Sequence, residues 1–392
     1  MNDKYMKIDK QNMKPQALIM AAALTTAMAV QAQNGKYISQ VYDFMPAPGQ
    51  FVNEIPEWEE GDTEATMLAK VGEQIIGGTS NGMISLGGYG GYVVFGFDHP
   101  VVNVLGERDF MVYGNSVYDS VDKNYVSGEP GIVMVSVDVN GNGKPDDEWY
   151  ELAGSDYNAS GTVHGYKITY SKPDPDRAAA ADPDADDSAI IDKTYIKWTT
   201  NCEAEPEGYV KRNSFHTTNS YWPNWLEDDE LTFEGTRLEC LVVNIATQGL
   251  RYMSKPRAWG YVDDLPNSAN EGYDIGWAVD ADGNAVHLPA IDFVKVYTAV
   301  NHEHGWIGEM STEICGAEDL HPTASVSEID YDGVIKIAGC EGMVKVQGAR
   351  EVAVYTLGGA MVARFEGDGE AALSPALYVV RADSRVAMVQ VR

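Results

Sequence analysis

Basic residues are scarce in this sequence of 392 residues, which holds 28 Lys and Arg against 59 Asp and Glu and has a formal net charge of -31. A surface this acidic repels phosphate, which argues against nucleic acid as a partner and against affinity for an anionic membrane. Cysteine is also rare. Cys202, Cys240, Cys315 and Cys340 lack the C-x-x-C spacing of a zinc site, and their spacing does not choose among the three possible disulfide pairings.

Common catalytic motifs are missing too. The sequence has no G-x-S-x-G, no H-E-x-x-H and no signature of a Cys-His protease. Paired carboxylates for glycoside hydrolysis have no fixed spacing in a sequence, so a secreted hydrolase acting on polysaccharide stays open as the alternative. The absences favour a non-enzymatic protein, and an adhesion or structural surface protein is a further alternative.

Long apolar runs are limited to one, "ALIMAAALTTAMAVQA" at residues 17–32, which follows four lysines. A basic segment, a short apolar run and small residues at its end are typical of a signal peptide, and the run is short for a membrane span. We predict a signal peptide over residues 1–32 with cleavage after Ala32. The expected protein is exported, secreted or held at the cell surface, and not membrane-spanning.

After residue 32 the sequence has no long segment with helical periodicity. It consists of short strand-like runs separated by Gly, Asn, Asp and Pro. The pattern predicts an all-β protein: a jelly-roll-like antiparallel β-sandwich over 38–320, followed by a small immunoglobulin-like β-sandwich over 325–392. An acidic loop at 172–189 interrupts the first sandwich. The clearest strand candidates are residues 92–97, 109–114, 131–138, 165–171, 238–246 and 291–300.

Aromatic residues gather in two segments that also contain Pro, Asn and Arg, "SYWPNW" and "KPRAWGY". If they lie on loops at one end of the sandwich, their rings would stack on a sugar or another flat ligand, with the arginine supplying hydrogen bonds. The alternative is that the rings cover the sandwich edge as part of the core. The candidate ligand-binding residues, called the aromatic group below, are Tyr221, Trp222, Trp225, Arg257, Trp259 and Tyr261.

Oxygen-bearing side chains alternate with glycine in "DVNGNGKPDD", residues 138–147. The spacing matches the first part of an EF-hand calcium loop, but position 12 is Trp149 instead of glutamate. We predict a structural calcium ion on a short loop between strands, with a solvated hairpin as the alternative. Its expected ligands are Asp138, Asn140, Asn142 and Asp146, and the backbone oxygen of Lys144.

Two of the few histidines form an H-x-H pair, His302 and His304. On a strand the two rings would share a face, which suits a transition metal. No third ligand lies within sequence reach, so a solvated loop is the favoured interpretation.

The C-terminal segment contains "VAVYTLGGAMVARFEG" and "LSPALYVV" before a final strand that ends in arginine. It resembles the C-terminal sorting domains of type IX secretion substrates in Bacteroidetes, although Ala376 stands where that family usually has glycine. The resemblance implies passage across the outer membrane by secretion machinery, then release or surface attachment. A plain immunoglobulin-like accessory domain is the alternative. The matching residues are Val352, Tyr355, Leu357, Gly359, Val362, Tyr378, Val380 and Arg392.

The central region contains "GGYVVFGFDHPVVN" and "GWAVDADGNAVHLPAIDFVKVYTAV". It is similar to bacterial cell-surface proteins of jelly-roll type, which in Bacteroidetes accompany outer-membrane nutrient uptake, including corrinoid uptake. This resemblance implies a glycan or corrinoid as small-molecule ligand and an outer-membrane receptor as partner. It implies no particular binding residue.

Overall fold

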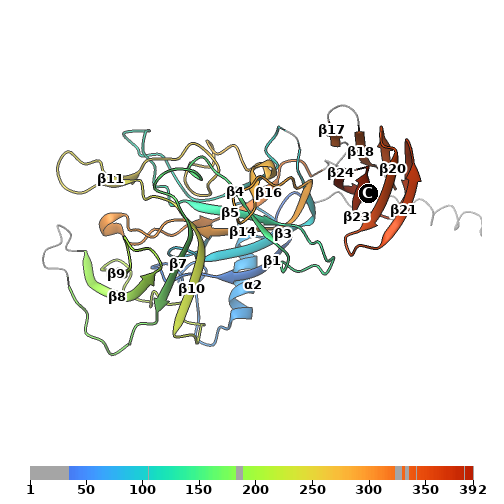
Figure 1. Cartoon of the computed structure of the whole chain (residues 1–392). Helices are drawn as coiled ribbons and strands as arrows, with labels where there is room; N and C mark the ends of the chain where they lie inside the picture. Colours follow the sequence, from blue (N-terminus) through green and yellow to red (C-terminus); the bar gives the residue numbers. More distant parts are fainter. Residues whose placement is uncertain are drawn as a thin grey trace, which may run out of the picture. The chain divides into compact units, whose positions relative to one another are not determined.

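The computed structural model describes residues 35–104, 106–181, 189–322, 329–331, 335–340, 342–383 and 385–391. The predicted signal peptide, residues 182–188 of the acidic loop and Arg392 lie outside this part of the chain. The described residues are mostly strands joined by turns (Figure 1). The expected all-β sandwich class is therefore confirmed, while the jelly-roll and immunoglobulin topologies stay predictions.

The larger sheet of the central region has six antiparallel strands in the order β1-β3-β14-β5-β6-β13. Its middle strands β3 and β14 are apolar almost throughout, as expected of strands that are covered on both faces. The strands are β1 (Gln40–Met45), β3 (Tyr92–Val102), β14 (Ala290–Thr298), β5 (Gly131–Ser136), β6 (Trp149–Leu152) and β13 (Ala278–Val279).

A second sheet has four antiparallel strands in the order β10-β7-β8-β9. Buried and exposed residues alternate along β7 and β10, so this sheet turns one face to the core and one to solvent. Its strands are β10 (Glu230–Arg237), β7 (Val163–Ser171), β8 (Ile190–Thr200) and β9 (Glu207–Asn213).

Tyrosine rings join the two sheets into one core. Tyr89 lies edge-on to Tyr166 of β7 at 4.9 Å between ring centroids and to Tyr297 of β14 at 6.3 Å. The Tyr297 hydroxyl also accepts a hydrogen bond from the backbone N–H of Thr236 in β10 at 2.9 Å. Buried side chains of both sheets form one hydrophobic cluster, which is the packing of a β-sandwich.

Three short antiparallel pairs lie outside these sheets. They position loops that matter below, together with two single-turn 3₁₀ helices, η1 (Ile275–Trp277) and η2 (Gly305–Ile307). The pairs are β2 (Ile84–Ser85) with β15 (Glu313–Ile314), β4 (Phe110–Tyr113) with β16 (Gly316–Asp319), and β11 (Val242–Asn244) with β12 (Tyr252–Ser254).

The described residues contain one α-helix, α2 (Glu64–Ile75), which the sequence pattern did not predict. The Thr63 side chain caps its N-terminus, and the Thr66 hydroxyl oxygen accepts a hydrogen bond from the backbone N–H of Thr63, which completes a capping box. Met67, Val71 and Ile75 recur at helical spacing and are buried, and the helix packs against β1. The helix is short, with an amphipathic pattern of only 12 residues, so it agrees with a sequence that has no long helical segment beyond the signal peptide.

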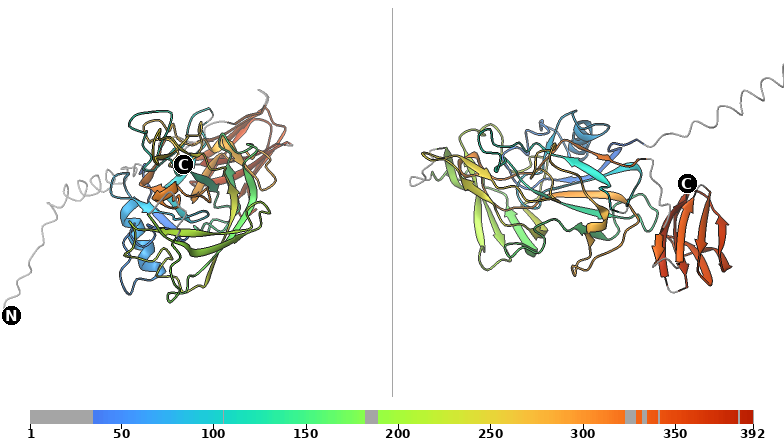
Figure 2. Two further views of the ribbon diagram at one scale, coloured as in Figure 1. Left: turned by 90° about the vertical axis from the view of Figure 1, so that its left-hand side faces the viewer. Right: turned by 90° about the horizontal axis from the view of Figure 1, so that it is seen from above.

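Strands β17 to β24 form two four-stranded antiparallel sheets, β17-β18-β19-β22 and β21-β20-β23-β24. Figure 2 shows these strands closely stacked. The turn between β20 and β21 contains Gly359 at a φ of 79°, a backbone conformation that glycine adopts without strain. The strands are β17 (Ile329–Tyr331), β18 (Ile335–Cys340), β19 (Met343–Gln347), β20 (Glu351–Thr356), β21 (Met361–Glu366), β22 (Gly369–Ala372), β23 (Ala376–Ala382) and β24 (Arg385–Val391).

None of the described helices has the length and apolarity needed to cross a membrane.

Candidate functional site

The aromatic group is mostly part of the core. Tyr221, Trp222, Trp225 and Tyr261 are 1%, 2%, 8% and 4% exposed. The expectation that these rings face solvent is wrong, because they fill the space beside the sheets, which was the alternative interpretation. Trp259 is the exception at 41% exposed, and its ring lies 4.4 Å from that of Trp277.

Arg257 is buried as well. Its guanidinium forms an ion pair with the carboxylate of Asp264 at 3.0 Å, and both side chains are 2% exposed. It also lies over the ring of Tyr261 at 5.6 Å. A guanidinium held in this way positions the 257–264 loop and is not free to bind a ligand.

A cleft of about 700 Å³ lies beside β8 and β9 and is called the β8–β9 cleft below. This volume falls within the range of small-molecule sites. Tyr209 is 40% exposed and Trp198 is 9% exposed, and both line the cleft with Tyr252. Its acidic lining residues are Glu205, Glu207, Glu303 and Glu309.

Two glycines make room for the rings of this cleft. Gly208 pairs with Trp198 across β8 and β9, and a Cβ on Gly208 would lie 2.3 Å from the indole. Gly305 has a φ of 56°, and a Cβ there would lie 2.2 Å from the Tyr252 ring. Both rings therefore lie directly against backbone, which fixes their orientation.

Two acidic residues of the cleft lining, Glu303 and Glu309, belong to one turn. The two residues form an isolated β-bridge, and hydrogen bonds from His304 N to Gly308 O and from Met310 N to His302 O close the turn between them. Glu303 Oε2 pairs with Lys211 at 2.8 Å, and Glu309 Oε1 accepts from the backbone N–H of Gln50 at 2.6 Å.

The second oxygens of these two carboxyl groups, Glu303 Oε1 and Glu309 Oε2, are buried and have no hydrogen-bond partner among the described residues. Burial raises the pKa of Glu309 well above its usual range. Buried polar atoms without partners are rare in folded proteins, and an ordered water or a ligand supplies the partner at such positions.

The predicted calcium loop connects β5 with β6, which are paired strands. Asp138 accepts hydrogen bonds from the backbone N–H groups of Asn142 at 3.0 Å and Gly143 at 2.8 Å. The side-chain amide groups of Asn140 and Asn142 both donate to Asp146, and these bonds lower the pKa of the Asp146 carboxyl. The four predicted side chains are thus brought together on an exposed loop. The Lys144 carbonyl accepts from Asp146 N at 2.9 Å.

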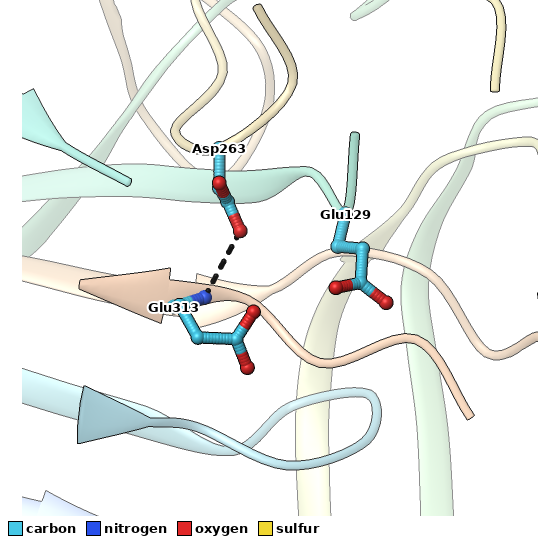
Figure 3. A group of neighbouring side chains, drawn as sticks. All are labelled: Glu129, Asp263 and Glu313. Atoms are coloured by element: carbon cyan, nitrogen blue, oxygen red, sulfur yellow. Dashed lines mark hydrogen bonds between the residues drawn. The ribbon is translucent and has the colours of Figure 1, made fainter. Parts of the chain in front are cut away.

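A second group of acids, which the sequence did not indicate, is buried inside the central region. One oxygen each of Glu129, Asp263 and Glu313 lies within 4.8 Å of the other two. Figure 3 shows the three side chains coming together from separate chain segments. Burial raises the pKa of all three groups, to about 8 for Glu129. These three residues are called the acid cluster below.

His304 belongs to the same region and is 5% exposed, so the solvated-loop interpretation is wrong for this histidine. Its Nδ1 lies 3.6 Å from Glu129 Oε1, and burial lowers its pKa to about 4. His302 is exposed at the border of the cleft. The two histidines therefore do not form the paired site that their spacing suggested.

Cys202, Cys240 and Cys315 are free thiols. Each is partly buried, and burial raises the pKa of Cys240 and of Cys315, so neither is an activated nucleophile. The side chain of Cys340 lies outside the described part of the chain.

No protein-family model and no curated protein matches this sequence. The functional argument therefore depends on the geometry of the β8–β9 cleft. A sequence signal for the cleft did exist, because Tyr209, Tyr252 and the segment "NHEHGWIGE" combine rings, acids and glycines. These residues are about 50 positions apart along the chain, and only the sheet topology joins them.

Proposed function

We propose that this chain is an exported, non-enzymatic binding protein that holds a glycan in the β8–β9 cleft. The observation that carries the proposal is a concave site in which Tyr209, Tyr252 and Trp198 stand next to several carboxyl groups. Aromatic rings stack on the apolar faces of sugars, and carboxylates accept hydrogen bonds from sugar hydroxyls. Glu205 and Glu303 supply such acceptors at the cleft wall.

A glycan fits this chemistry better than a corrinoid does. The cleft is rich in acceptors, which match the many hydroxyl donors of a sugar. A corrinoid is a large macrocycle with peripheral amides, and it needs a broader apolar surface. The sequence resemblances support nutrient capture at the cell surface as the role of this binding. They also support a role for the C-terminal strands as a sorting domain.

Calcium at Asp138, Asn140, Asn142 and Asp146 is the structural part of the proposal. The support is the spacing of these residues and the tight turn of the loop, with Gly141 and Gly143 at φ values of 70° and 71°. Glycine tolerates this backbone, which a calcium loop needs for its sharp turn.

The experiment is a binding screen followed by matched variants. The mature protein is titrated with xylan, mannan, β-glucan and N-glycan oligosaccharides and with cobalamin, and intrinsic tryptophan fluorescence is recorded. Tyr209→Ala should lower the affinity for the bound sugar at least about tenfold. Trp259→Ala is the matched control, because the two side chains are equally exposed at 40% and 41%, and it should bind normally. If only Trp259→Ala loses binding, the ligand binds at the aromatic group and not in the β8–β9 cleft.

The second candidate function is a polysaccharide hydrolase. It is favoured by Glu303 and Glu309, two acidic residues of the cleft lining that are paired across one turn, because burial raises the pKa of Glu309 well above its usual range. A protonated acid beside a carboxylate is the pair that glycoside hydrolysis uses. Release of reducing ends from the bound polysaccharide, abolished by Glu309→Gln, would establish this reaction in place of simple binding.

A further inference from the structure

Exposed apolar side chains gather just beyond the β8–β9 cleft, on the loop that follows β9 and on η2. Phe215 is 60% exposed and Ile307 is 43% exposed. The ring centroids of Phe215 and Trp306 are 5.5 Å apart, which is the distance of an aromatic pair in contact. Phe215, Trp306 and Ile307 are called the apolar patch below.

Both segments of the apolar patch lead directly out of the cleft lining. Trp306 follows Gly305, which lines the cleft, and both residues lie in η2. Phe215 follows β9, a strand whose residues 207–211 line the cleft. Because the Phe215 and Trp306 rings are in contact, the two segments stay together beyond the cleft. The apolar patch is therefore a continuation of the cleft.

A buried asparagine fixes the backbone beneath the apolar patch. Asn213 is 0% exposed, and its side-chain amide donates to Gln50 Oε1 and to Ile307 O, both at 2.8 Å. Its side-chain oxygen accepts from the backbone N–H groups of Phe215 at 3.0 Å and of His216 at 3.1 Å. Exposed side chains on a backbone held in this way are preorganised, so a ligand binds them with a smaller loss of conformational entropy.

The size of the apolar patch argues against a protein partner. Even if every atom of them were exposed, three large apolar side chains of about 150–250 Å² each would present less than the roughly 800 Å² that each partner of a stable complex buries. The apolar face of a single sugar unit is a better match for one pair of rings. Continuity with the cleft gives the same occupant, because the cleft is the proposed glycan site.

We infer that the apolar patch is a second sugar subsite, so that the ligand of the β8–β9 cleft is a chain of several sugar units. This inference rests on the proposed function. Tyr209 and Asn213, the last residue of β9, are separated by about 13 Å in an extended strand, and Phe215 lies beyond that end. A disaccharide stacked on Tyr209 does not reach Phe215, whereas a longer chain contacts both rings.

The experiment compares ligands of two lengths. The mature protein is titrated by calorimetry with disaccharides and hexasaccharides of the xylan, mannan and β-glucan series. We expect the hexasaccharide of one series to bind at least about tenfold more tightly than its disaccharide. Phe215→Ala should remove this difference and leave the affinity for the disaccharide unchanged. Phe215→Tyr keeps a ring at this position and should bind both lengths as the wild type does.

Two further variants serve as controls. Met361→Ala is the matched control, because Met361 is 56% exposed but lies in β21, and it should bind both lengths normally. Tyr209→Ala should weaken the binding of both lengths, because it removes a ring of the cleft itself.

The outcomes separate this inference from the proposed function. If Tyr209→Ala weakens binding but the wild type binds both lengths equally, or Phe215→Ala keeps the full hexasaccharide affinity, the subsite is refuted and the cleft remains a glycan site. If no series binds, both proposals are wrong. If sedimentation shows that Phe215→Ala breaks up a dimer without changing sugar affinity, the apolar patch contacts a second copy of the chain, and the inference is overturned.

Discussion

Replacing Trp222 with alanine tests whether the aromatic group is core or binding surface. The Trp222 ring is 2% exposed, and its Nε1 has no hydrogen-bond partner among the described residues. The bonds that Asn53 makes here go to the backbone oxygens of Ser220 and Trp222, so they survive the substitution. Removing a buried indole costs about 3–5 kcal/mol, and removing an unsatisfied buried N–H returns about 1 kcal/mol or more.

We therefore expect Trp222→Ala to lower the free energy of unfolding by about 3 kcal/mol. Trp222→Phe keeps most of the ring volume and also removes the unsatisfied N–H, so it should cost about 1 kcal/mol or less. Urea denaturation followed by far-UV circular dichroism measures both. Tyr209→Ala, which removes a side chain that is 40% exposed, should change stability by less than about 1 kcal/mol.

The reasoning fails if Trp222→Ala unfolds at the wild-type urea concentration while sugar binding disappears. That result would mean that the indole is exposed to ligand in solution. A destabilised variant that still binds sugar below its melting temperature would support the core assignment.

Four further predictions concern the fold, the cleft and the calcium loop. Burial raises the pKa of Asp109 to about 7, above the value of about 3.9 in an unfolded chain. The protonated Asp109 carboxyl therefore contributes stability that is complete below about pH 4 and is lost as pH rises through 7, and in this range the free energy of unfolding falls by up to about 1.4 kcal/mol per pH unit. Asp109→Asn should remove this pH dependence when urea midpoints are compared between pH 5 and 8. Thr63→Ala removes the N-cap of α2 and should cost about 1 kcal/mol, whereas Thr63→Ser should cost little; amide exchange of α2 reports both. Gly305→Ala should displace the Tyr252 ring and weaken sugar binding, whereas Gly249→Ala, which also has a positive φ but open space around it, should not; fluorescence titration compares them. Chelation should lower the melting temperature of the wild type by several degrees more than that of Asp146→Asn. Equal shifts of the two proteins in scanning calorimetry would refute calcium binding at the loop.

Much of the fold follows from local pattern. The predicted strands at 92–97 and 165–171 lie within β3 and β7, and the one at 131–138 covers β5 and extends two residues past its end. Alternating or continuous apolar runs bounded by turn residues predict such strands well. Helix α2 was missed, although Thr63 and Thr66 carry a capping signal. Two capping threonines and one short apolar stripe are a weak signal in a sequence dominated by strands.

The candidate site was harder to predict, because burial depends on tertiary packing. Nothing in "SYWPNW" distinguishes a ring that covers the core from one that faces a ligand, and packing against the sheets decides for Trp222. The acid cluster gathers Glu129, Asp263 and Glu313 from positions far apart in the chain. Its existence follows from the pairing of β15 with β2 and of Val262 with Gly131, and no sequence spacing encodes these contacts.

The central claim is that ligand binds beside β8 and β9 and not at the aromatic group. Hydrogen–deuterium exchange of the sugar-bound and free protein tests it most directly. The account predicts new protection in residues 205–211 and 301–309, with little change in residues 257–261. Protection confined to residues 257–261 would contradict it.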